Sequence, residues 1–107
     1  MIESDVPVYN FAAEKGVALS ISMRYKDGAG VPVNLTGWSG VIRFKGFSSA
    51  GVESIALTLG SDGSVKGRIP ASSLDFKKGR YVIDLTPPTE PEFRFVKGEI
   101  NVEESWL

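Results

Sequence analysis

The sequence contains no cysteine and no histidine. Without cysteine, the chain has no disulfide, no thiolate nucleophile and no zinc–thiolate site. Without histidine, it lacks the side chain that most often acts as a general base near neutral pH and most often binds transition metals. A Ser–His–Asp or Cys–His catalytic arrangement is therefore impossible within this chain. We expect no enzymatic activity, no cofactor and no metal site.

Long apolar runs and an excess of one charge are also missing. No apolar segment approaches the ~20 residues of a membrane span, and residues 1–5 show neither the basic start nor the apolar run of a secretion signal. The 12 basic and 13 acidic residues are mixed along the chain and leave a net charge of −1. No basic stripe indicates nucleic-acid binding. We expect no membrane and no nucleic-acid partner, and synthesis in a cytoplasm.

The 107 residues predict a single domain over residues 1–107, large enough to enclose one hydrophobic core. The 12 glycines and 6 prolines fall between short apolar segments, a spacing typical of an all-β sandwich or barrel. Residues 17–25 alternate most clearly, with Leu19, Ile21 and Met23 on one face and polar side chains on the other. Such alternation predicts a strand with one buried face.

The same pattern predicts strands over residues 6–11, 17–25, 38–44, 53–59, 64–69, 79–86 and 92–103. One short helical turn is expected within residues 70–76, with Ser72 or Ser73 as its cap. The last strand changes phase between Phe95 and Ile100, which predicts a β-bulge near residues 96–98. The predicted core consists of Leu19, Ile21, Trp38, Ile42, Phe44, Leu57, Tyr81, Ile83, Phe93 and Ile100.

The acidic residues are candidates for catalytic or calcium-binding groups. A glycosidase needs two carboxyl groups that converge on a cleft, for which a small sandwich with short loops has little room. A calcium site needs several oxygen ligands at close spacing, whereas the loops at Asp27 and Asp62 offer one carboxylate each. We interpret the carboxylates as turn formers and solubilising charges, namely Asp27, Asp62, Asp84, Glu103 and Glu104.

Most aromatic residues fall on the faces assigned to the core, and Phe47 and Trp106 are the exceptions. Trp106 and Leu107 form a large apolar pair directly after Glu103, Glu104 and Ser105. Such a pair either folds back onto its own domain or docks onto a neighbour. The candidate interface residues are therefore Phe47, Val102, Trp106 and Leu107.

Several short segments, taken together and in order, resemble the N-terminal domain of phage baseplate upper proteins and the small phage tail proteins related to it. The most specific is Gly30-Val31-Pro32-Val33-Asn34-Leu35-Thr36-Gly37. The others are Tyr9-Asn10-Phe11 with Gly16, Asp27-Gly28, Ile69-Pro70-Ala71, Gly79-Arg80-Tyr81-Val82-Ile83-Asp84-Leu85 and Gly98-Glu99-Ile100-Asn101-Val102. The resemblance implies an immunoglobulin-like antiparallel β-sandwich of about seven strands, without catalytic residues.

The resemblance also implies a bacteriophage virion structural protein, in a tail, baseplate or fibre-attachment position. Such a module acts through contacts with other virion proteins, in a homo-oligomer or a hetero-assembly, after synthesis in the bacterial host cytoplasm. The alternative is a carbohydrate- or surface-binding β-sandwich, which a coplanar pair of exposed aromatic rings would favour. A regulator or inhibitor with an immunoglobulin-like fold is a third possibility.

Overall fold

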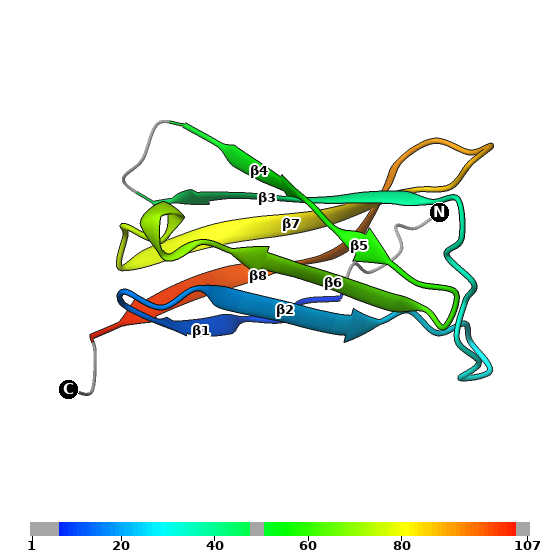
Figure 1. Cartoon of the computed structure of the whole chain (residues 1–107), viewed down its shortest axis with the longest axis horizontal. Helices are drawn as coiled ribbons and strands as arrows, with labels where there is room; N and C mark the ends of the chain where they lie inside the picture. The colour runs from blue at the N-terminus through cyan, green and yellow to red at the C-terminus, as the bar shows by residue number, and fades with distance from the viewer. Residues whose placement is uncertain (1–6, 48–50, 105–107) are drawn as a thin grey trace.

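The structure, a computed structural model, describes residues 7–47 and 51–104. Its strands are β1 (Phe11–Glu14), β2 (Leu19–Arg24), β3 (Ser39–Gly46), β4 (Glu53–Ala56), β5 (Thr58–Leu59), β6 (Ser64–Ile69), β7 (Lys78–Thr86) and β8 (Phe93–Glu103). They form two stacked sheets (Figure 1), one with the order β1-β8-β7-β3-β4 and one with the order β2-β6-β5. The predicted all-β sandwich is confirmed.

The strand order is that of an immunoglobulin-like sandwich. In that fold one sheet contains strands G, F, C and C′, and the other contains B, E and D. Here β8-β7-β3-β4 and β2-β6-β5 occupy the same places. One pairing differs from the expected antiparallel arrangement, because β1 runs parallel to β8 and Phe11 lies opposite Ile100. The five-stranded sheet is therefore mixed.

The first predicted strand, over residues 6–11, is placed too early in the chain, since β1 begins at Phe11. Among the described residues before β1, pairing with β8 is limited to a bridge between Val8 and Lys97. The regular ladder is interrupted because the side-chain oxygen of Asn10 accepts the N–H of Glu99 at 3.0 Å. A side chain here replaces the backbone carbonyl that a strand would supply.

The predicted strand over residues 53–59 is two strands in different sheets. β4 pairs with β3, and β5 pairs with β6. The chain crosses from one sheet to the other at Leu57, whose N–H donates to the carbonyl of Gly40 at 2.9 Å. The apolar alternation of Ile55, Leu57 and Leu59 runs through this crossing without a break, so the pattern alone does not reveal the change of sheet.

The predicted β-bulge exists, one residue earlier than expected. Ile83 pairs with Val96, and the next residue, Asp84, pairs with Arg94. Phe95 is therefore the extra residue, just before the predicted 96–98. The bulge lets Phe93, before it, and Ile100, after it, both turn toward the core despite their opposite parity in the sequence.

The core lies between the two sheets and follows the sequence prediction closely. Of the predicted core residues, Trp38, Leu57 and Phe93 are half-buried and pack around its margin, and the others are buried. A short 3₁₀ turn, η1 (Ala71–Ser73), confirms the expected helical turn. Its predicted serine cap is wrong, because Pro70 precedes the turn without a side-chain bond and the Ser73 hydroxyl donates instead to Glu53 at 2.9 Å.

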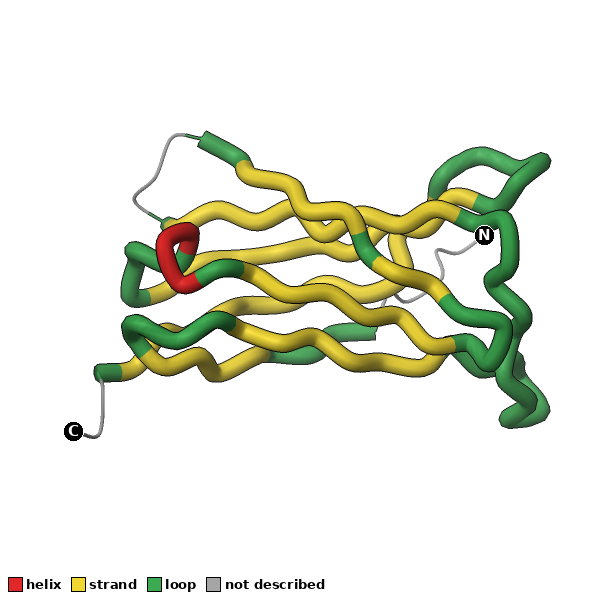
Figure 2. The backbone as a smooth tube through the Cα atoms, in the orientation of Figure 1, coloured by secondary structure: helices red, strands yellow, loops and turns green. Residues whose placement is uncertain are grey.

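The long connection between β2 and β3 lies at the same end of the sandwich as the β7–β8 loop (Figure 2). It is built from two side-chain turns. Asp27 Oδ1 accepts the N–H groups of Ala29 and Val31 at 2.9 and 3.0 Å, and Asn34 Oδ1 accepts the N–H of Thr36 at 2.9 Å. The described residues contain no helix with the length and apolarity needed to cross a membrane.

Candidate docking surfaces

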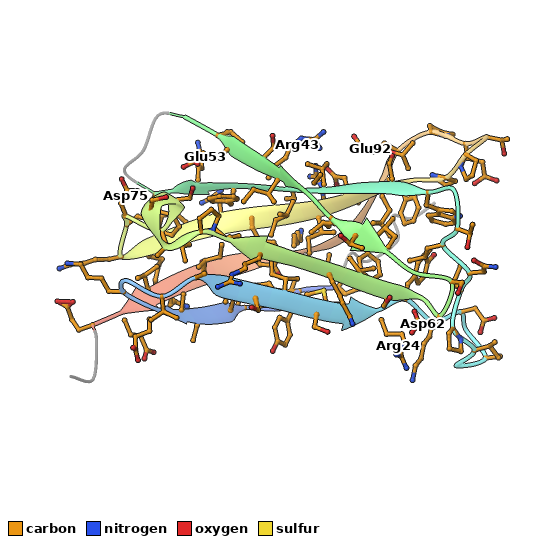
Figure 3. All side chains as sticks on the ribbon, in the orientation of Figure 1. Arg24, Arg43, Glu53, Asp62, Asp75 and Glu92 are labelled. Atoms are coloured by element: carbon orange, nitrogen blue, oxygen red, sulfur yellow. The ribbon has the colours of Figure 1, made fainter. Side chains whose placement is uncertain are left out.

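The loop carboxylates bind their own turns. Asp27 closes the β2–β3 loop as described above. Asp62 Oδ1 accepts the N–H of Ser64 at 3.1 Å, and its other oxygen lies 3.4 Å from Arg24 Nη2 (Figure 3). The hydrogen bonds from Ser64 hold the pKa of Asp62 below its usual value. Within residues 7–47 and 51–104, no group of three or more acidic side chains is arranged to hold a metal ion.

Asp84 is buried between two arginines on the outer face of the five-stranded sheet. Its carboxylate lies 2.6 Å from Arg43 Nη1 and 2.9 Å from Arg94 Nε. Arg43 also lies 3.4 Å from Glu92, across the same face (Figure 3). The hydrogen bond to Asp84 raises the pKa of Arg94. Both carboxylate oxygens of Asp84 are bonded to arginines, so Asp84 holds β3, β7 and β8 together. Glu103, at the exposed end of β8, has no paired basic side chain among the described residues.

Apolar and basic side chains gather elsewhere on that outer face. Phe47 is 46% exposed, and the guanidinium carbon of Arg80 lies 5.0 Å from the centre of its ring. Val52 and Val8 are 62% and 63% exposed. Two shallow hollows run along the face and share Arg80 and Val82. We call this surface the outer patch, and it consists of Val8, Lys45, Phe47, Val52, Arg80, Val82 and Lys97.

The outer patch carries more positive than negative charge. Lys45 and Arg80 are opposite one another on β3 and β7, and Lys97 is opposite Val82 on β8. Glu99, opposite Arg80, adds one carboxylate at the rim. An apolar strip flanked by lysine and arginine is suited to a protein surface that offers apolar side chains and carboxylates.

The four predicted interface residues have different positions. Phe47 lies in the outer patch. Val102 is half-buried, lies opposite Ala13 and packs against the core. Trp106 and Leu107 lie outside the described residues. Val8 and Val52 were not predicted as interface residues, because neither belongs to a large apolar pair or cluster in the sequence.

A second surface lies on the open side of the sandwich, where β2 faces the N-terminal half of β8. It is a groove of about 1150 Å³. At one end of the groove the rings of Tyr25 and Phe95 are 5.1 Å apart. Trp38 lies 6.1 Å from Tyr25 and 6.1 Å from Phe93. These rings are half-buried and meet at angles between 43° and 83°, so they form no flat platform for a sugar ring.

The chain is similar to a known protein in structure but not in sequence. No protein-family model matches it, and no curated protein is similar to it in sequence. Among solved structures it is similar to the N-terminal domain of phage TP901-1 ORF48, with a TM-score of 0.63 and 14% sequence identity. The match covers 87% of this chain and 83% of that one. The chain thus has the fold of that phage N-terminal domain, which confirms the resemblance to a phage N-terminal domain that its sequence segments predicted.

Proposed function

We propose that the chain is a structural module of a bacteriophage virion that attaches to other virion proteins in a tail, baseplate or fibre-attachment position. The observation that carries the proposal is the likeness to the phage TP901-1 ORF48 domain, which extends over 87% of this chain and 83% of that domain. The likeness thus involves the domain as a whole. The described residues add no cluster suited to metal chemistry.

The outer patch is the contact surface in this proposal. Complete burial of an exposed valine or phenylalanine contributes about 1.5–3 kcal/mol. Burial of three such side chains, Val8, Phe47 and Val52, therefore supplies a useful part of a binding free energy. The loss of translational and rotational freedom on association opposes this gain. Arg80, stacked on Phe47, is of one of the three residue types, with tryptophan and tyrosine, that are enriched among residues that dominate binding energy. The partner surface is expected to be apolar and acidic.

The test measures binding to each tail and baseplate protein encoded beside this chain in its genome. Each purified protein is titrated against the wild-type chain and against Phe47→Glu. A single buried charge at the centre of an interface weakens binding by about tenfold or more. Thr58→Glu is the matched control, since Thr58 is exposed on β5 of the other sheet. Mass spectrometry of purified particles provides an independent readout.

The proposal predicts that one of these proteins binds, that Phe47→Glu weakens the complex, and that Thr58→Glu does not. It also predicts that purified particles contain the chain. If particles lack the chain and none of the neighbouring gene products binds it, the virion assignment is wrong. If a partner binds but both variants bind equally well, the outer patch is the wrong surface.

A further inference from the structure

β2 is an edge strand whose outward backbone groups lack a strand partner among the described residues. It pairs with β6 on one side and ends the three-stranded sheet on the other. Directly after β2, the N–H of Tyr25 donates to the carbonyl of Gly63 at 2.8 Å, in register with the β2–β6 ladder. Hydrogen-bonded and non-bonded pairs alternate along such a ladder. The residues whose N–H and C=O groups point away from β6 are therefore Ser20, Ser22 and Arg24.

The groove begins at this edge and has apolar walls. Met23 lines it from β2, and Phe11 and Phe95 line it from the opposite sheet. Across the groove, residues 93–96 of β8 pair with β7 alone within the described chain, because β1 covers only the C-terminal end of β8. On its rim the space thus has backbone donors and acceptors that pair with no described strand, and inside it has room for apolar side chains. These are the requirements for adding one more strand.

The charges around the groove have a single sign. Arg24, Lys26 and Arg94 line it, and no carboxylate among the described residues does. Arg94 is already bonded to Asp84, so Arg24 and Lys26 provide most of the attraction for an incoming chain. Among the described residues, the guanidinium of Arg24 has one ion-pair partner, the exposed carboxylate of Asp62, 3.4 Å from its Nη2. The groove therefore favours an acidic segment over a neutral or basic one.

We propose that this groove binds an extended, acidic peptide segment of a partner protein, which pairs with β2 as a fourth strand of the smaller sheet. Its alternate apolar side chains enter the groove, and its carboxylates face Arg24 and Lys26. A second copy's β2 does not satisfy this geometry, because its Leu19 and Ile21 are buried in its own core and would leave the groove unfilled. The inference stands independently of the virion assignment.

The test uses a synthetic library of random heptapeptides, passed over the immobilised full chain and read by mass spectrometry. Enriched peptides are expected to alternate apolar residues with aspartate or glutamate. The most enriched peptide is then made with a fluorescent label, and its affinity is measured by anisotropy at low and high salt. Affinity is expected to fall at high salt, since exposed charges are screened.

Two substitutions at one position separate backbone pairing from side-chain contact. Ser22→Pro removes the outward N–H of residue 22, and an edge strand tolerates proline at such a position. The substitution is expected to weaken binding of the peptide about tenfold. Ser22→Ala keeps that N–H and is expected to leave affinity unchanged. Arg24→Glu reverses a lining charge and is expected to weaken acidic peptides while leaving the unfolding temperature within a few degrees of wild type. Thermal unfolding of each variant checks that the fold is intact.

Three results would overturn the inference. The first is a library without enrichment, or with enrichment of basic peptides. The second is equal affinity for Ser22→Pro and Ser22→Ala in folded proteins. The third is binding seen only after removal of residues 1–6, because the chain's own N-terminal segment would then be the occupant of the groove and not a partner.

Discussion

The hydroxyl of Tyr81 donates a hydrogen bond to the backbone carbonyl of Tyr9, 72 residues earlier in the chain. Tyr81 lies on β7 opposite Gly98 of β8, and Tyr9 lies next to the same glycine, outside the sheet's regular ladder. A Cβ at Gly98 would overlap the Tyr9 carbonyl. The missing side chain of Gly98 therefore lets residues 7–10 lie against β8, and the Tyr81 hydroxyl holds them there.

Tyr81→Phe is expected to destabilise the fold by about 1–2 kcal/mol, because it leaves the Tyr9 carbonyl without its donor. Urea unfolding at neutral pH measures this loss. Tyr9→Phe is the control, since it removes the hydroxyl of the exposed Tyr9 ring and keeps the backbone carbonyl that accepts the bond. A loss of equal size in both variants would show that the Tyr81 bond to Tyr9 adds nothing.

Stability at high pH tests the same residue in a second way. Burial raises the pKa of Tyr81, with a smaller contribution from Tyr9, while the unfolded chain keeps a tyrosine pKa near 10. Above about pH 10 the unfolded state loses a proton that the folded state retains, so the stabilisation present at lower pH is progressively lost. Wild type is expected to lose more stability than Tyr81→Phe between pH 9 and about pH 11. Parallel curves for the two proteins would contradict the assignment.

Gly98→Ala is expected to release residues 7–10 from β8 while the core stays folded. The new methyl group meets the Tyr9 carbonyl and the Asn10 side-chain oxygen, and overpacking of this kind costs about 1–3 kcal/mol. Hydrogen exchange is expected to accelerate at the amides of Tyr9 and Glu99, which lose their acceptors. Gly28→Ala is the control, because nothing lies within 4 Å of its Cβ position. Unchanged exchange at Tyr9 in Gly98→Ala would disprove the close fit.

The sequence predicted those parts of the fold that depend on local alternation. Strand β6 has its expected bounds, and Ile21, Ile42 and Ile83 are buried as expected. The sequence did not predict features that depend on a distant partner. Next to the parallel β1–β8 pairing, the side-chain oxygen of Asn10 accepts the N–H of Glu99 on β8. At the switch of sheet, the N–H of Leu57 donates to the carbonyl of Gly40. Neither contact leaves a periodic signal.

The same limit applies to the candidate surfaces. Phe47 was predicted because it is an aromatic residue that falls outside the faces assigned to the core. The groove was not, since its rim consists of backbone groups of Ser20 and Ser22, which look like ordinary solvated strand residues in the sequence. Whether an edge is covered depends on where another strand ends, here β1 at the far end of β8.

Asp84→Asn tests the ion cluster on the outer face. The substitution leaves Arg43 and Arg94 without their shared carboxylate, but both arginines are partly exposed and water replaces part of the interaction. The expected loss is about 1–2 kcal/mol, less than for a fully buried pair. Denaturant unfolding in low and high salt measures it, and Asp75→Asn, at an exposed turn, is the control. Equal stability of the two variants would show that the cluster is dispensable.

The role of Trp106 and Leu107 stays a prediction, because they lie outside the described residues. Burial of both side chains supplies several kcal/mol at about 25 cal/mol per Å² of apolar surface, reduced by the entropy lost on association. Deletion of the two residues is expected to lower the mass measured by sedimentation across a range of concentrations and to leave the unfolding temperature unchanged. The opposite result would be that both the full chain and the chain truncated after Ser105 are monomers and that the truncated chain unfolds at a lower temperature. It would mean that the pair packs onto its own domain.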